Sequence, residues 1–542
     1  MFLLSSSKQM KKSEKKLLHQ KNNFLPNSQL MEKIKKNLKI DKNKISIILF
    51  LLSLLFFTTI FYLIRHFMTN IDELDNIAAP FLMAQGEKFY LDIFNMHFPL
   101  PFYVAYFFTS FWANEGPSRA IAVFRLSLLF AYFIPFLLVF FSFKNKKTKN
   151  IFSFWIILMS LLAPLYHGNL YVSETFTTIF IASIFWVIAP IVLNLEKFSN
   201  YHLSLMILFA SLAFWTQPLL ILLFLLPLFF IRKKQFLSFI SYSFILNIIP
   251  IIYLVLNGQF PAFFHQTIIF NSQTYSHFFP EQINNYSMFY QNIIVFFKNE
   301  LYLFTHFYNA TSISQFISHF IFFLFLIVVI SKRKIKYLLA IILIFVETRS
   351  REIKIIPGQI YNFPIFPFLS ISTASIFLLT AYFKKLKNKI ILIIALSIVF
   401  VCVILNFKPI FLQSLSLGYN YEVFWSYRQR IGEDIAKLTK PDEKILIYPH
   451  NSDFYFFAHR KPFDKFVYWY PWINSVDEFR NERLKALREN PPSLIYYGNL
   501  SYKDNPKAYS EFFPDLLKNY INVIKDDEKT NYWLREDLKD RL

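Results

Sequence analysis

Residues 70–103 read NIDELDNIAAPFLMAQGEKFYLDIFNMHFPLPFY and lie a few residues beyond the first long apolar run of the chain. The stretch opens on the acid pair Asp72-Glu73. Its first half, Glu73–Ala84, has the apolar spacing of a helix that lies on a bilayer surface, and Gly86 suits the end of that helix. Paired acids at the edge of a bilayer, followed by short amphipathic pieces, indicate a functional loop rather than a plain connection.

Apolar runs long enough to cross a bilayer recur along most of the chain, which is 55% hydrophobic and 20% aromatic. Clusters of Lys and Arg separate these runs and mark the cytoplasmic side by the positive-inside rule. This pattern predicts a polytopic α-helical membrane protein with about eleven spans, with its N-terminus in the cytoplasm and its C-terminus outside. The shorter run Leu100–Ala113 is predicted to be interfacial or re-entrant. The predicted spans are Ile45–Ile64, Arg119–Phe143, Ile151–Leu165, Thr175–Leu193, His202–Thr216, Pro218–Ile231, Phe236–Leu256, Ile313–Ser331, Tyr337–Val346, Pro357–Phe383 and Ile390–Asn406.

The net charge of +22 lies wholly in residues 1–418, because residues 419–542 hold 20 basic and 20 acidic side chains. The surplus lies in the short loops and the Lys-rich segment 1–44, so we predict no nucleic acid partner. Segment 1–44 is interpreted as a cytoplasmic tail that fixes topology or contacts anionic lipid. The single cysteine, Cys402, excludes an internal disulfide and a cysteine metal cluster.

The composition changes near Tyr419, where helical and strand patterns begin to alternate. Lys444–Tyr448 and Leu494–Tyr497 are predicted to be strands, and Phe424–Leu438 and Val476–Arg488 are predicted to be helices. Further strand candidates are Tyr520–Ile524 and Tyr532–Leu534. The sequence therefore predicts three parts: the tail 1–44, a membrane domain 45–418 with a catalytic external loop 65–118, and a small extracytoplasmic α/β domain 419–542.

Asp72 and Glu73 have two interpretations that spacing leaves open. A carboxylate at the membrane surface can take a proton from a hydroxyl or amine nucleophile, while a second carboxylate helps to hold a substrate or a divalent cation. Alternatively, Asp72 caps the helix Glu73–Ala84.

Other polar side chains fall on the same external side of the predicted topology. Glu174 enters an apolar span, where an acid is costly unless it is paired or functional, and it is the candidate metal partner of Asp72. For Asp92, His97 and Glu174 a structural role is the alternative. The candidate substrate-binding residues of this group are Tyr90, Asp92, His97, Glu174, Gln217, Asn271 and Tyr275.

Arg349 and Arg351 break the positive-inside pattern on the external side. Arginine binds phosphate in bidentate geometry, so they are candidates for a phosphate site, with salt bridging inside their loop as the alternative. Tyr361 completes the candidate substrate-binding set. No Walker, HExxH or GxSxG motif is present, so the sequence gives no support for nucleotide-driven transport or common hydrolase chemistry.

The stretch 70–103 resembles the first external loop of the GT-C superfamily of membrane glycosyltransferases, especially the protein O-mannosyltransferases and the bacterial lipid A aminoarabinose transferases. The residues that carry the resemblance are Asp72-Glu73, Ala78-Ala79, Gly86, Tyr90 with Asp92, and His97 with Pro99.

The resemblance implies an inner-membrane enzyme, assigned here to a bacterium, that moves a sugar from a polyprenyl-phosphate donor to a lipid, glycan or protein acceptor outside. It implies that Asp72 is the general base, that Glu73 and Glu174 position substrates or a divalent cation, and that Arg349 and Arg351 bind the lipid phosphate. Two other hypotheses remain: a transporter of lipid-linked saccharides, and a non-catalytic glycolipid-binding assembly protein.

Overall fold

The computed structural model describes most of the chain, which forms two compact units, Met1–Leu52 and Ser53–Leu542. In the first unit only the start of helix α3 is described. Side chains of some residues at helix and strand ends, including Asp72, are not described. The described ranges are 42–65, 71–113, 117–166, 168–275, 310–332, 334–348, 365–382, 425–448, 451–467, 473, 476–498, 517–526 and 530–542.

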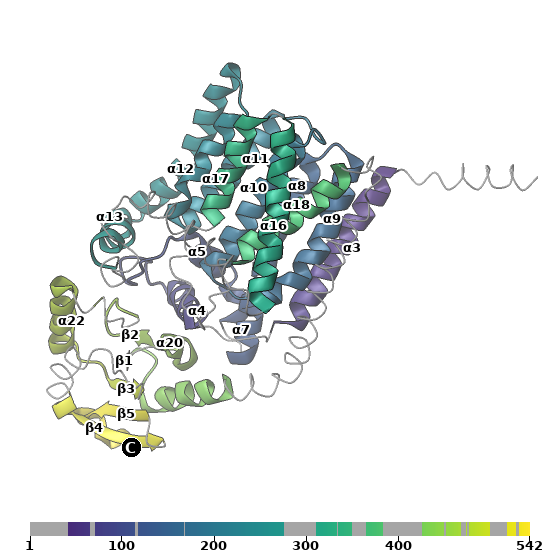
Figure 1. Ribbon diagram of the computed structural model, residues 1–542. Helices are drawn as coiled ribbons and strands as arrows, with labels where there is room; N and C mark the ends of the chain where they lie inside the picture. Colours follow the sequence, from purple (N-terminus) through teal and green to yellow (C-terminus); the bar gives the residue numbers. More distant parts are fainter. Residues whose placement is uncertain are drawn as a thin grey trace, which may run out of the picture. The chain divides into compact units, whose positions relative to one another are not determined.

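Helices joined by short loops make up the described part of the first four hundred residues (Figure 1). The α-helices are α3 (Lys42–Leu63), α4 (Ile71–Ala84), α5 (Leu100–Phe107), α6 (Thr109–Trp112), α7 (Pro117–Leu126), α8 (Leu128–Ser142), α9 (Lys146–Leu162), α10 (Ser173–Val192), α11 (Asn200–Thr216), α12 (Phe236–Leu256), α13 (Phe260–Phe264), α16 (Ala310–Ser331), α17 (Ile335–Thr348) and α18 (Ile365–Tyr382). Short 3-10 or π segments are η1 (Ala163–Tyr166), η2 (Pro218–Phe229), η3 (Lys233–Gln235), η4 (His265–Ile269) and η5 (Asn271–Tyr275).

Four described segments are long and apolar enough to cross a membrane, and shorter apolar helices accompany them. The protein is therefore an integral membrane protein, as the hydropathy predicted. The predicted span Ile390–Asn406 lies outside the described residues, so the total of about eleven stays a prediction. The four segments are Lys44–Leu63, Arg119–Ser142, Ser173–Val192 and Lys233–Leu256.

Helix α10 is the centre of the helix bundle. Its side chains from Thr175 to Val192 are all buried, because α8, α11, α17 and α18 pack around it (Figure 1). Helix α12 contrasts with it, since most of its apolar side chains are exposed, as lipid-facing residues are. Its polar Asn247 accepts a hydrogen bond from Trp215 Nε1 of α11, the kind of contact that joins helices in a bilayer.

Two predicted helical segments differ in detail from the structure. The predicted span Arg119–Phe143 is interrupted at Ser127, between α7 and α8. The run Pro218–Phe229 is a 3-10 helix rather than an α-helix. A 3-10 helix rises about 2.0 Å per residue, against 1.5 Å for an α-helix, so this short segment reaches roughly 24 Å instead of 18 Å.

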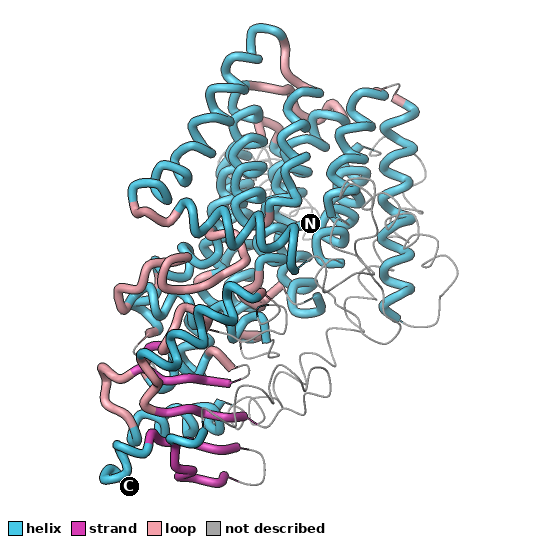
Figure 2. The backbone as a smooth tube through the Cα atoms, turned by 90° about the vertical axis from the view of Figure 1, so that its left-hand side faces the viewer, coloured by secondary structure: helices cyan, strands magenta, loops and turns pink. Residues whose placement is uncertain are grey.

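The C-terminal part forms one five-stranded sheet in the order β2-β1-β3-β5-β4 (Figure 2, magenta). Strand β1 pairs in parallel with β2 and β3, whereas β5 runs antiparallel to β3 and β4. The strands predicted from KILIY, LIYY and the two later runs are confirmed, and the two-residue β2 was not predicted. The strands are β1 (Lys444–Tyr448), β2 (Lys461–Pro462), β3 (Leu494–Gly498), β4 (Tyr520–Asp526) and β5 (Thr530–Arg535).

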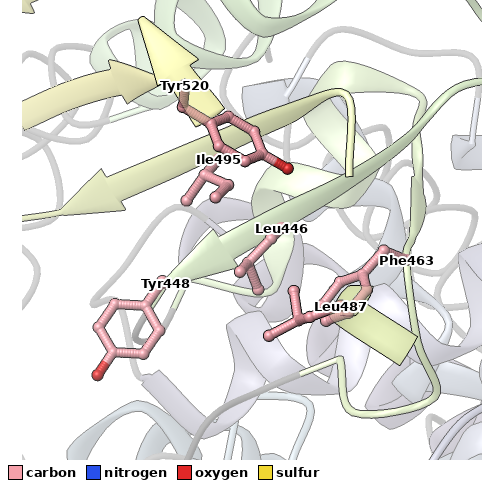
Figure 3. Close-up of a cluster of buried hydrophobic side chains, with 6 residues drawn as sticks. All are labelled: Leu446, Tyr448, Phe463, Leu487, Ile495 and Tyr520. Atoms are coloured by element: carbon pink, nitrogen blue, oxygen red, sulfur yellow. The ribbon is translucent and has the colours of Figure 1, made fainter. Parts of the chain in front are cut away.

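Helices complete this C-terminal part. They are a helix over 425–438, α20 (Asp453–Ala458), α22 (Asp477–Glu489), η8 (Leu517–Asn519) and η10 (Glu536–Arg541). An apolar cluster joins α22 to the sheet (Figure 3), and Leu446 of β1 and Ile495 of β3 lie in it almost without exposed surface. Helix α20 packs on α4, where the rings of Phe81 and Phe456 meet edge to face at 5.1 Å. The C-terminal part therefore contacts the stretch 70–103 through the packing of α20 on α4.

Gly432, in the helix over 425–438, predicts an unusual response to substitution. A Cβ at this position would lie 2.6 Å from the backbone carbon of Phe457 in α20. Replacing a glycine inside a helix by alanine normally stabilises it by about 1 kcal/mol. Here Gly432→Ala is expected to destabilise the protein by about 1–3 kcal/mol, because backbone has to move. Thermal unfolding of the full chain measures this change, with the exposed Glu433→Ala as control; a stabilised Gly432→Ala protein contradicts the packing.

Candidate active site around helix α4

Glu73 lies in the first turn of α4 and forms a buried ion pair with Arg125 of α7. The side chains of Glu73 and Arg125 are 1% and 0% exposed. Arg125 donates from Nε to Glu73 Oε1 at 2.8 Å and from Nη2 to Oε2, which is the bidentate geometry of a strong charge-assisted pair. The sequence prediction missed Arg125, although an arginine inside an apolar run needs a partner and is itself a signal.

Backbone groups complete this network. The amide of Tyr171 donates to Glu73 Oε1 at 2.9 Å, and Arg125 Nη1 donates to the carbonyl of Arg65 at 2.8 Å. Asn76, one turn further along α4, donates to the Tyr171 carbonyl at 2.9 Å. Both carboxylate oxygens of Glu73 are thus used to join α4 to α7 and to the turn before α10. Glu73 thus has a structural role in this arrangement, and its predicted catalytic role stays a prediction.

Asp72 precedes this residue in the same helical turn. Helix α4 begins at Ile71, so Asp72 lies inside the first turn and not at the capping position that one interpretation gave it.

The chain from Gln85 to Pro99 is a tight loop with two left-handed residues. Gly86 ends α4 with φ +92°, as predicted, and Tyr90 has φ +68°, which is costly for a residue with a side chain. Tyr90 is buried and donates its hydroxyl proton to the His97 carbonyl at 2.8 Å. Asp92 accepts from the backbone amide of Lys88 at 2.8 Å and closes a turn. These contacts give Tyr90 and Asp92 roles in the shape of the loop.

The π-helical segments η4 and η5 hold this loop from one side. Gln266 accepts from the Asn95 amide at 2.9 Å and donates to the Tyr90 carbonyl at 2.7 Å. Asn271, predicted to contact a substrate, donates to the Met96 carbonyl at 2.8 Å. Gln266 was missed because a lone glutamine in an apolar run matches no motif.

The C-terminal part holds the loop from another side. The Phe94 amide donates to the Lys465 carbonyl at 2.7 Å, and Lys461 Nζ lies 2.6 Å from Glu87 Oε1. The ring of Phe94 lies within 5.3 Å of those of Phe466 and Phe479, measured between ring centroids. The loop therefore has fixed contacts to two segments that are distant in sequence.

A second buried ion pair lies next to this junction. Arg483 Nε of α22 is 3.1 Å from Asp464 Oδ2, and both side chains are more than nine-tenths buried. Burial raises the pKa of Asp464 to about 6, although Arg483 acts in the opposite direction. Burial likewise lowers the pKa of Arg483 to about 10. Desolvation thus outweighs the mutual attraction of the two charges.

Glu174 and Gln217 lie at the ends of two bundle helices. Glu174 is half-buried in the first turn of α10, and its carbonyl accepts the hydroxyl protons of Thr177 and Thr178. Gln217 ends α11 and is 8% exposed. Within the described part of the chain its amide Nε2 has no hydrogen-bond partner, which is unusual for a buried polar group.

The remaining predicted residues are not described. Arg349, Arg351, Tyr361 and the side chains of Asp72 and Tyr275 lie outside the described set. Within that set, no group of three or more His, Cys, Asp or Glu side chains gathers as a metal site would require. The predicted metal pair of Asp72 and Glu174 includes an undescribed side chain, so it stays a prediction.

Similarity to known proteins is found among solved structures. No family model matches the chain, and no curated protein matches it. Among solved structures, the chain is similar to a crystal structure of ArnT from Cupriavidus metallidurans bound to undecaprenyl phosphate. The match covers 90% of this chain and 97% of that one, with 11% sequence identity and a TM-score of 0.45.

The Glu73–Arg125 pair predicts strong energetic coupling. Arg125→Met leaves a buried carboxylate without its cation and is expected to destabilise the protein by about 3–5 kcal/mol. Glu73→Gln leaves the buried guanidinium without its anion and has a similar effect. The double variant should lose much less than the sum, because neither charge remains. Thermal unfolding of the four purified proteins measures the coupling, and additive losses would contradict the pair.

Asp464 predicts a pH dependence of stability. Its pKa is raised from 3.8 to about 6. Between these values the folded chain holds a proton on Asp464 that the unfolded chain has lost. The contribution of Asp464 to the free energy of unfolding therefore falls by about 3 kcal/mol as the pH rises through this window, and it is constant above it. Thermal unfolding from pH 4 to 8 measures this fall against Asp464→Asn, which lacks the titrating group. Parallel pH profiles of the two proteins would contradict it.

Proposed function

We propose that this chain is a membrane glycosyltransferase that moves a sugar from a polyprenyl-phosphate donor to an acceptor on the extracytoplasmic side, with Asp72 as the general base. The observation that carries the proposal is the Glu73–Arg125 pair. It gives one acid of the Asp72-Glu73 motif a structural role and anchors the helical turn that holds the other. The motif resemblance over residues 70–103 supports the donor class.

The proposed reaction is a single displacement. The acceptor oxygen (or nitrogen) bonds to the anomeric carbon while the bond from that carbon to the phosphate oxygen breaks, and the acceptor proton passes to Asp72. The electron pair of the broken bond leaves with the lipid phosphate, so no nucleotide is needed. Because the nucleophile attacks opposite the leaving group, the anomeric configuration inverts. This step requires Asp72 in its ionised form.

Other side chains are proposed to hold the substrates. The buried side-chain amide of Gln217 supports this assignment, because it can donate a hydrogen bond to a sugar hydroxyl or a phosphate oxygen. Glu174 is proposed to bind sugar hydroxyls at the mouth of α10. Arg349 and Arg351 are proposed to neutralise the leaving phosphate, with Tyr275 and Tyr361 beside the substrate. Asp72 and Glu174 are also proposed to hold a divalent cation.

The proposed setting is the inner membrane of a bacterium. The basic tail and the short Lys-rich loops support an N-terminus in the cytoplasm, and the predicted odd number of spans supports a sheet region outside. In that arrangement the acids of the first loop and the C-terminal sheet share the external side. The contact between α4 and α20 supports this placement, because it requires both on one side of the membrane.

The function is tested by mass spectrometry of envelope glycolipids and glycoproteins. A deletion strain of the source bacterium is complemented with wild type, with Asp72→Asn or with the control Asp75→Asn, at equal protein levels. One sugar mass is expected to disappear in the deletion, to return with wild type and Asp75→Asn, and to stay absent with Asp72→Asn, with a loss of at least about 100-fold. Full restoration by Asp72→Asn would show that Asp72 is not the base.

A further inference from the structure

Gln266 is a buried residue of the candidate site that belongs to no sequence motif. It lies in η4 and is 4% exposed, yet both ends of its amide are used on the loop. Its oxygen accepts from the Asn95 amide and its nitrogen donates to the Tyr90 carbonyl, residues that are 171 and 176 positions away. One side chain therefore bridges two backbone groups five residues apart.

The π-helical geometry explains why Asn271 can act beside Gln266. In a π-helix the hydrogen bonds run between residues five apart, so positions 266 and 271 stack on one face. In an α-helix, five residues correspond to about 140° of rotation, which would direct the two amides apart. The wider turn thus directs Asn271 to the Met96 carbonyl while Gln266 holds Tyr90 and Asn95. Short π segments are rare and often mark functional sites.

The held segment is strained. Tyr90 keeps φ +68°, a conformation that a residue with a side chain adopts only when its surroundings enforce it. Gln266 binds its carbonyl, and its own hydroxyl binds the His97 carbonyl, so the backbone is fixed at both ends of the turn. The loop is the connection between α4, which carries Asp72, and α5. The α5 end of this connection is joined to the first turn of α4 through Tyr171, which donates its hydroxyl proton to the Pro101 carbonyl and its amide proton to Glu73 Oε1.

We propose that Gln266, assisted by Asn271, is a positioning residue of the transfer reaction, acting through the backbone of residues 90–96. This inference rests on the proposed function. A fixed loop presents the bound sugar phosphate and the acceptor in reacting geometry and avoids an ordering cost during catalysis. Loss of the amide lowers kcat, whereas the donor KM changes little, because the residue touches no substrate.

The first test needs no activity. Lys88 is exposed at the start of the loop and is a trypsin site. Gln266→Met keeps the length of the side chain but loses both hydrogen bonds, so cleavage after Lys88 in the full-length protein is expected to speed up roughly 10-fold, because local opening becomes easier. Gln266→Glu keeps the acceptor for the Asn95 amide, so its cleavage rate should lie between those of wild type and Gln266→Met. The control is Gln259→Met, a buried glutamine that contacts Tyr103 instead. An unchanged cleavage rate in Gln266→Met overturns the inference.

The second test uses the same purified proteins with a polyprenyl-phosphate sugar donor and the acceptor found by mass spectrometry. In Gln266→Met, kcat is expected to fall at least about 10-fold with the donor KM within about twofold, while Gln259→Met behaves as wild type. An unchanged kcat beside faster cleavage overturns the positioning role. If the wild-type protein transfers no sugar, the proposed function fails and the positioning role fails with it. The difference in cleavage rate would still show that Gln266 holds the loop, so the two failures are distinguishable.

Discussion

The buried ion pair between Glu73 and Arg125 is the constraint on which the candidate site depends. Removing two charges from water is expensive, and the structure compensates for it with bidentate geometry and with backbone partners at Tyr171 and Arg65. Because these partners belong to different segments, the pair is satisfied only when the start of α4, the helix α7 and the turn before α10 are assembled. Glu73 of the acid motif is therefore a structural anchor of the candidate site.

The loop that follows α4 is held by two further parts of the chain. The amides of η4 and η5 bind its backbone, and the Lys465 carbonyl binds the Phe94 amide. Residues that look like surface loops in the sequence are thus enclosed by parts of the chain more than 170 and 370 positions away. A site of this kind is preorganised by the whole compact unit, which suits a reaction that relies on the alignment of two substrates.

Much of the fold was predictable because hydropathy and β-branched runs act locally. The runs around α10 and α12 gave spans, and KILIY gave β1 at its observed bounds. The site was predictable only in part. The acid pair could be identified, but the structural role of Glu73 depends on Arg125, 52 residues away. Gln266 could not be found, since its role arises from a π-helical turn and a contact 176 positions away, which local patterns do not encode.

The most direct measurement is an experimental structure of the full-length protein with a polyprenyl-phosphate sugar donor bound. We expect the anomeric carbon to lie within roughly 6 Å of the Asp72 carboxylate, which leaves room for an acceptor atom in contact with both. We also expect Glu73 to remain paired with Arg125 in that complex. A donor bound far from the first turn of α4, or a Glu73 carboxylate released from Arg125 to meet the substrate, would contradict the division of roles between the two acids.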